Sequence, residues 1–270
     1  MWIASETPGE GLDTSSQDQQ PLSRFEKQTD ELRTRLKIPG MSAVIVKDQK
    51  VLWAKGFGFA DFENRVPATP DTLYSIASLT KTFAATLVMQ LVEQGKLDLD
   101  EPVSHYSTDF KNDSVKVKHL LSHTSGGPTP GDRYQYDGDQ YNYLTAVIEK
   151  KTGKPFREVM VKTFLDPLQM ASSVPGQSVV DEVDKWAPVL GSDNLKRYAS
   201  DLSRLAQPYT LYGDSEIVHV PYPGKKFFGA AAGLDSTVLD LAKFDAAIDH
   251  HQFLKKETQE KAWTNFVSNS

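Results

Sequence analysis

The chain has 270 residues, a net charge of −6 and no cysteine. A chain of this length buries on the order of 70–75% of its unfolded surface, so one large domain or two small ones are possible. The negative charge argues against nucleic-acid binding, and the lack of cysteine excludes disulfides and thiolate chemistry. No apolar run approaches the ~18 residues that a membrane-spanning helix needs.

The first elements follow a polar start. Residues 1–23 are rich in Ser, Gly and Gln, and we expect them to form a flexible leader without the apolar stretch of a signal peptide. Apolar residues at helical spacing predict a helix over residues 22–36, which ends before a Pro-Gly pair. Residues 41–57 indicate two strands of an antiparallel hairpin. A helix from residue 75 then ends at Gly95.

The middle of the chain is mostly helical in pattern, with Pro- and Gly-containing loops. A short helix is expected to end at Gly126 and Gly127. The segment "QYNYLTAVIEKKTGKPF" has apolar residues on one helical face, and Gly153 should end that helix. A further helix should close at Pro167. We expect these helices to form a unit of their own.

The last helix is expected to begin at Ser236 or Thr237, either of which can cap it. A helix and hairpin, a helical insertion and a returning helix together predict an α+β fold. We expect an α/β domain over residues 24–100 and 226–270, and a mostly helical domain over residues 101–225.

Ser78 and Lys81 stand three residues apart, so their side chains share one face of the predicted helix. This is the chain's single Ser-x-x-Lys, where composition alone predicts roughly one. Lys81 is therefore either a solvated surface charge or a base beside a nucleophile. A base role has a mechanism, because burial favours the neutral amine that can accept a serine proton. The free N–H groups at the helix start, that of Ser78 included, would stabilise developing negative charge.

Two other groups of polar residues have chemical readings. Four tyrosines crowd residues 134–143, and most such rings simply pack, yet one facing Lys81 would move protons between nucleophile and leaving group. His119 and His123 stand at i, i+4, as metal ligands on a helix do, but no glutamate base lies between them. We expect neither a metal nor a cofactor.

Five sequence blocks resemble the serine β-lactamase and penicillin-binding protein superfamily, most of all its class C and carboxypeptidase/esterase branch. The resemblance covers residues 24–265, and Ser-x-x-Lys is the signature of that chemistry. Five blocks in family order are far more specific than one. The blocks are "LYSIASLTKTFAATLVMQLVEQGKLDLDEPV", "VKHLLSHTSGG", "PGDRYQYDGDQYNYLTAVIEKKTGKPF", "LDPLQM" and "AAAGLDSTVLDLAKF".

The resemblance implies a β-lactamase/transpeptidase-like fold and a serine hydrolase that forms an acyl-enzyme. It places Ser78 as nucleophile, Lys81 as base and Tyr136 as the catalytic tyrosine, with Gly138 in a substrate-binding position. The expected substrates are β-lactams, D-alanyl peptides or small esters, and the expected location is outside a bacterial cytoplasm, with the signal removed. A cytoplasmic location stays open.

Two departures from the family pattern leave an alternative open. Gly138 stands where the family usually has asparagine, and the loop at residues 127–130 is short, which should leave one wall of the cleft open. The altered position favours a catalytically silent binding or scaffold module. The intact Ser78, Lys81 and Tyr136 favour an enzyme.

The family's third motif, Lys-Thr-Gly or His-x-Gly on a cleft-lining strand, has no counterpart after the last block. We therefore expect an incomplete catalytic domain whose hairpin at residues 41–57 has an unpaired edge. The complementary strands should come from a separate C-terminal chain or a partner. Losing one oxyanion donor costs about 10²–10³ in rate, so the chain alone should be poorly active.

Overall fold

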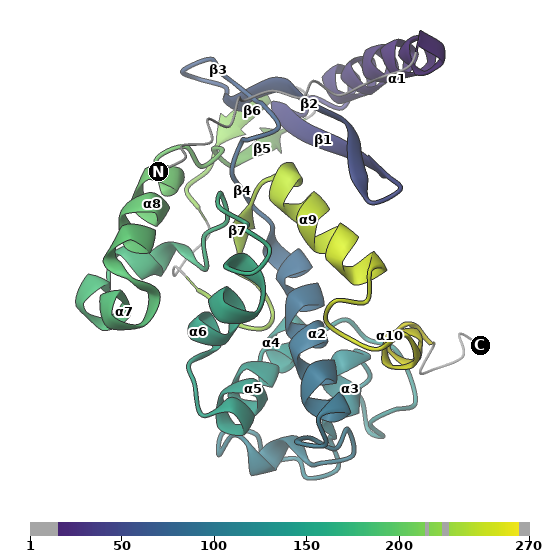
Figure 1. Cartoon of the computed structure of the whole chain (residues 1–270), viewed down its shortest axis with the longest axis vertical. Coiled ribbons are helices and arrows are strands. Elements are labelled where there is room, and N and C mark those ends of the chain that lie inside the picture. Colours follow the sequence, from purple (N-terminus) through teal and green to yellow (C-terminus); the bar gives the residue numbers. More distant parts are fainter. Residues whose placement is uncertain (1–15, 214–215, 223–226, 265–270) are drawn as a thin grey trace, which may run out of the picture.

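The computed structural model describes residues 16–213, 216–222 and 227–264, and it shows helices with small antiparallel sheets (Figure 1). The α+β class predicted from the sequence is confirmed. The helices are α1 Ser16–Arg35, α2 Thr80–Glu93, α3 Val117–Leu121, α4 Gly138–Tyr141, α5 Leu144–Thr152, α6 Phe156–Met160, α7 Val183–Leu190, α8 Ser192–Leu202, α9 Val238–Asp249 and α10 Lys256–Trp263, with 3-10 turns η1 Ala77–Leu79, η2 Val103–His105 and η4 Gln177–Val180 and a π-turn η3 Val161–Leu165. The strands are β1 Gly40–Lys47, β2 Lys50–Asp61, β3 Val66–Pro67, β4 Tyr74–Ser75, β5 Tyr209–Tyr212, β6 Glu216–His219 and β7 Asp235–Ser236.

Strands β1 and β2 form the predicted hairpin, and they pair antiparallel along the whole of β1. Asp48 and Gln49 make the turn with φ angles of 48° and 63°. Two-residue hairpin turns need these left-handed values, because they match the twist of the flanking strands. The short strand β3 pairs with the other edge of β2, so the order is β1-β2-β3.

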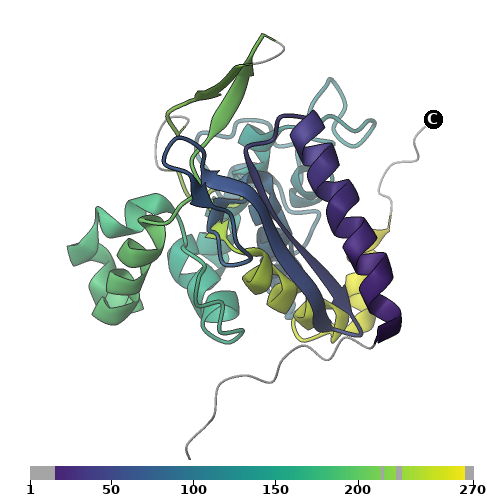
Figure 2. The same ribbon diagram turned by 90° about the horizontal axis from the view of Figure 1, so that it is seen from above.

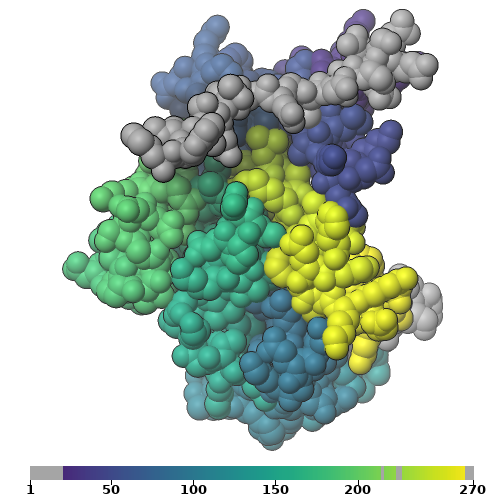
Figure 3. Space-filling model, viewed as in Figure 1, coloured from purple at the N-terminus to yellow at the C-terminus, as the bar shows by residue number. Residues whose placement is uncertain are grey.

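Helices cover both faces of this sheet (Figure 2). On one face, Phe25 of α1 meets the Trp53 ring edge to face at 5.4 Å, and the Trp53 indole N–H donates to Glu26 at 2.7 Å. On the other face, α9 packs against β1 and β2. Helices α9 and α10 form the middle of the molecular face that Figure 3 presents, beside the hairpin.

A cluster of phenylalanines forms the centre of the core. Phe83 of α2 stacks on Phe244 of α9 with ring centroids 3.8 Å apart, and Phe164 of η3 meets Phe83 edge to face at 5.4 Å. Burying a side chain of this size contributes about 1.5–3 kcal/mol. The core therefore joins α2, α9 and the helical segment between them. The predicted division into two domains stays a prediction.

Several predicted helix ends are confirmed. Helix α2 is followed by Gly95 at φ 67°, and α5 ends at Gly153 at φ 70°, both in the left-handed conformation that glycine adopts easily. Of the two candidate caps for the helix that is α9 in the structure, Thr237 is the N-cap, and its hydroxyl accepts the Asp240 N–H at 3.1 Å.

Other expectations were wrong. Helix α1 begins at Ser16, inside the predicted leader, because extending an existing helix costs far less than starting one; residues 1–15 lie outside the described residues. Helix α3 ends at Leu121, not at Gly126, because its last carbonyls bond the amides of His123 and Thr124.

Two further differences lie in the segment predicted as mostly helical. The helix expected to end at Gly153 is broken into α4 and α5. Between them, the amides of Tyr143 and Thr145 bond the carbonyls three residues earlier, and not four as in an α-helix. The hairpin β5–β6 was missed, because its short strands lie largely at the surface and lack a clear alternation of apolar residues. Within the described residues, no helix combines the length and apolarity needed to cross a bilayer.

Candidate active site

The serine of the Ser-x-x-Lys pair lies on a strand–turn–helix connection. Strand β4 pairs with β7, and the chain then turns through η1 into α2. Ala77, just before the serine, has φ 45°, a left-handed conformation that costs a non-glycine residue about 1–2 kcal/mol. Ser78 is exposed at this turn. Strained backbone of this kind is typical of functional sites.

Lys81 lies one helical turn after the serine and is only 9% exposed. Its ammonium donates to the Ser78 hydroxyl at 3.2 Å and to the Ala231 carbonyl at 2.7 Å. The same nitrogen lies 5.0 Å from the Tyr136 ring centroid and 5.3 Å from that of Tyr141. The surface-charge reading of Lys81 is therefore wrong, because the side chain points into the protein toward the serine.

Two tyrosines approach the lysine with opposite protonation preferences. The Tyr136 hydroxyl lies 2.7 Å from Ser78 Oγ. Hydrogen bonds from Lys81 and then from Ser78 lower the pKa of Tyr136. Tyr141 donates its hydroxyl to the Lys81 backbone carbonyl at 3.1 Å, and burial raises its pKa. Tyr136 is thus the tyrosine suited to exchange a proton, while Tyr141 keeps its own.

Gly138 brings no side chain to the lysine. A Cβ added there would lie 3.9 Å from Lys81 Nζ, with no other atom within 4 Å outside the adjoining residues and the backbone of α4. The glycine begins α4, whose N-cap is Asp137, and the Asp137 carboxylate accepts the Gln140 N–H at 2.8 Å. The space beside the ammonium is therefore open to a small polar group.

The segment after Phe228 positions the lysine and the nucleophile turn. Besides the Ala231 carbonyl, the Leu234 amide donates to the Thr80 hydroxyl at 3.1 Å, and the Leu234 carbonyl accepts the Ile76 N–H at 3.0 Å. Sequence reasoning missed Ala231, because a backbone carbonyl has no residue-type signal. The matched block "AAAGLDST" was the one available indication.

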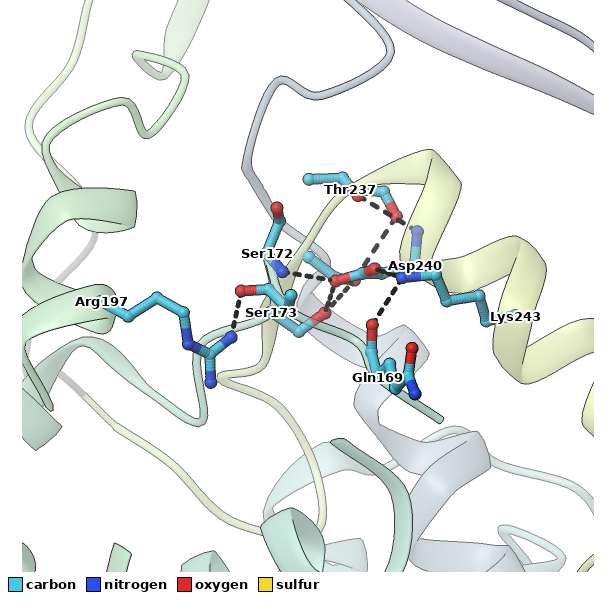
Figure 4. Close-up of polar contacts among 9 residues, drawn as sticks. Gln169, Ser172, Ser173, Arg197, Thr237, Asp240 and Lys243 are labelled. Carbon is cyan, nitrogen blue, oxygen red and sulfur yellow. Dashed lines mark hydrogen bonds and ion pairs between the residues drawn. The ribbon is translucent and has the colours of Figure 1, made fainter. Parts of the chain in front are cut away.

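The buried carboxylate of Asp240, at the start of α9, bonds residues of the turn after η3 (Figure 4). It accepts the Ser172 N–H at 2.8 Å and the Ser173 hydroxyl at 2.9 Å, and Lys243 donates to its other oxygen at 2.8 Å. The start of α9 is thereby tied to the turn after η3.

The two histidines of the i, i+4 pair each accept a backbone N–H through a ring nitrogen. The His119 ring accepts the Lys116 N–H at 3.1 Å, and the His123 ring accepts the Asp137 N–H at 3.2 Å. In the described part of the chain, no three His, Asp or Glu side chains are arranged to hold a metal ion.

A separate groove of about 1260 Å³ lies beside α2, α3 and α10. Met89, Leu121 and Trp263 are among its lining residues, whereas Ser78, Lys81 and Tyr136 do not line it. The clustered polar groups, and not this groove, therefore form the candidate active site.

The sequence profile of the beta-lactamase family matches residues 25–270. The chain belongs to the beta-lactamase family. Protein flp of Staphylococcus aureus (strain MW2) is 31% identical over 169 residues, 49% of this chain and 34% of that protein. The putative penicillin-binding protein PbpX of Bacillus subtilis (strain 168) is 26% identical over 252 residues, 83% of this chain and 58% of that protein.

The fold of this beta-lactamase family member is also similar to solved structures. The octameric penicillin-binding protein homologue from Pyrococcus abyssi has a TM-score of 0.76 at 30% identity, covering 92% of this chain and 61% of that one. The chain spans 34% and 58% of the lengths of these two curated relatives.

Proposed function

We propose that the protein is a serine hydrolase that forms a covalent acyl-enzyme. The observation that supports this most is the arrangement around Ser78 Oγ, with the Tyr136 hydroxyl at 2.7 Å and Lys81 Nζ at 3.2 Å. A nucleophile within hydrogen-bond reach of a base, which another group orients in turn, is the signature of nucleophilic catalysis. Here the Ala231 carbonyl orients the lysine.

In the proposed reaction, Ser78 Oγ attacks a carbonyl carbon, and its proton passes to the Tyr136 oxygen in the phenolate form or to Lys81 in the neutral amine form. The Ser78 N–H stabilises the oxyanion. The same pair then protonates the leaving nitrogen or oxygen as its bond to carbon breaks. Water, deprotonated by that pair, hydrolyses the ester on Ser78 and regenerates the serine.

We propose a β-lactam, a D-alanyl peptide or a small ester as the substrate, on the resemblance of the sequence blocks. The space that Gly138 leaves beside Lys81 is compatible with the polar group of any of the three. The same glycine supports the second candidate function, a catalytically silent binding module, because the amide of the family's asparagine is absent there.

Covalent labelling tests the proposal. A fluorescent penicillin should add one probe mass to the intact chain, and a fluorophosphonate should add one probe mass less HF, because fluoride leaves; both adducts should be located at Ser78. Ser78→Ala should remove the adduct, Lys81→Ala should slow labelling by about 10²–10⁴, and Tyr136→Phe should be milder. Ser200→Ala, an exposed serine on α8, is the matched control. No Ser78 adduct with either probe would leave the silent module as the better reading.

We also propose the partner expected from the sequence, a complementary C-terminal chain. Strand β1 has a strand neighbour on one side only within the described residues, which supports the addition of another strand at its free edge. Amide hydrogen exchange tests this. In the isolated chain, half of the β1 amides should exchange fast, and adding the complementary chain should protect them. Unchanged exchange would contradict it.

We further propose that the protein acts outside the bacterial cytoplasm. The absence of cysteine and the likeness to a putative penicillin-binding protein support this location. Fractionation of the native host, with antibody detection, tests it, and recovery with cytoplasmic markers would contradict it.

A further inference from the structure

His123 contacts the chain on both sides of Tyr136. Its backbone carbonyl accepts the Gln135 N–H at 2.7 Å, and its ring nitrogen Nδ1 accepts the Asp137 N–H at 3.2 Å. The imidazole lies against the phenol itself, with ring centroids 4.4 Å apart and planes tilted by 31°. One residue thus binds the residue before Tyr136, the residue after it and its ring.

The backbone makes this arrangement stiff. His123 has φ 52°, and it follows α3 in the left-handed position of a helix-ending motif, in which Thr124 N–H bonds the His119 carbonyl at 2.8 Å. The ring also stacks on Tyr141, with centroids 5.0 Å apart. Tyr141 in turn bonds the Lys81 carbonyl. The imidazole therefore contacts both the phenol beside Ser78 and a tyrosine that is anchored on α2.

The contact with Asp137 requires one protonation state. A backbone N–H can only donate, so Nδ1 must present its lone pair, and the neutral ring has its proton on Nε2. A protonated ring would place Nδ1–H against the Asp137 N–H, two donors facing each other. It would also add a second positive charge near Lys81.

We propose that His123 is a positioning residue for Tyr136: its neutral ring fixes the phenol against Ser78, and protonation of the ring releases the phenol and slows acylation. The groups that face the ring are the Lys81 ammonium, the phenols of Tyr134, Tyr136 and Tyr141, and the Asp137 carboxylate. Burial, and then the Lys81 charge, lower the pKa of His123, while Asp137 acts in the opposite direction. The neutral state is thereby favoured at neutral pH.

This inference rests on the proposed hydrolase function, and two variants separate the roles of the ring. His123→Asn keeps an acceptor oxygen near Nδ1 and tolerates positive φ, but it cannot titrate. His123→Phe keeps a ring and loses the acceptor. His119→Asn is the matched control, because His119 also accepts a backbone N–H through Nδ1.

The first measurement is the rate of fluorophosphonate labelling of Ser78 against pH. Below the pKa of His123, the wild-type rate should fall by up to an additional tenfold per pH unit, until it reaches the rate of Tyr136→Phe. His123→Asn should lack this additional fall, and His119→Asn should keep it. In the Tyr136→Phe background, exchanging His123 should change nothing. An additional fall that persists in His123→Asn would overturn the proposal.

The second measurement needs no turnover. Ultraviolet titration of each variant, minus the same variant with Tyr136→Phe, isolates the ionisation of the Tyr136 phenol. His123→Phe should raise the pKa of Tyr136, because a displaced phenol loses its hydrogen bonds to Lys81 and Ser78, whereas His123→Asn should not. An unchanged phenol titration in His123→Phe would refute the positioning role. Absence of any Ser78 adduct at every pH would instead refute the hydrolase function.

Discussion

Gly138 lies beside Lys81 Nζ but has no side chain to contact it. The 3.9 Å from a Cβ at this position to Lys81 Nζ is ordinary van der Waals contact, and the glycine has no left-handed φ. A longer side chain therefore fits without moving the backbone. The position tests how much a polar group beside the lysine contributes to acylation.

We predict that Gly138→Asn labels Ser78 faster than the wild type, by about 10- to 150-fold, since one hydrogen bond to a charged group contributes about 1.5–3 kcal/mol. Gly138→Ala is the control, because it fills the space without an amide. Both variants should be slightly more stable to heat, as glycine is a poor helix former. The measurement is the labelling rate at saturating probe. Equal rates for the two variants would contradict the prediction.

Among the elements, the β4–β7 pair contains a buried acid directly beneath the nucleophile turn. Asp235 is 0% exposed, and its Oδ2 has no hydrogen-bond partner among the described residues. Burial raises the pKa of Asp235 to about 7, against weaker hydrogen bonds from Gln177 and Ser75. Near neutral pH, the folded protein therefore holds a proton that the unfolded chain has lost.

This raised pKa makes stability depend on pH. The stabilising effect of the protonated acid is complete below about pH 4 and is lost as the pH rises through about 7. Asp235→Asn cannot ionise. We predict that its free energy of unfolding, minus that of the wild type, is larger at pH 8 than at pH 4. The gain is at most on the order of 4 kcal/mol. Thermal melts at both pH values measure it, and an equal difference in Tm at both would contradict the prediction.

Some contacts of the candidate site could be predicted from the sequence, and others could not. The Ser78–Lys81 contact was predictable, because one helical turn makes the two residues neighbours. Their contact with Tyr136, which is 58 residues from Ser78, was suggested only by family resemblance. Ala231 was not predictable, because any residue type supplies a carbonyl. The helix end at His123 was also missed, since no glycine marks the left-handed position there.

At the scale of the whole molecule, the core contains residues from the first and last thirds of the described chain. Phe83 and Phe244 stack across α2 and α9, and α9 packs against the N-terminal hairpin. The element types were predictable from periodicity and caps, whereas this closure was not, because packing between distant segments has no local pattern. The closure is what brings the Ala231 carbonyl to Lys81.

The bond from Lys81 to Ala231 joins residues 150 positions apart. Closing such a long loop is slow, because its entropy is lost before distant contacts compensate for it. We therefore predict that refolding restores helical circular dichroism before Ser78 becomes reactive toward a fluorophosphonate in quenched-flow labelling. Simultaneous recovery would contradict this order. During synthesis on the ribosome, the nascent chain would then emerge with its serine and lysine already made yet inert, and reactivity would begin only after residue 231 has left the ribosome.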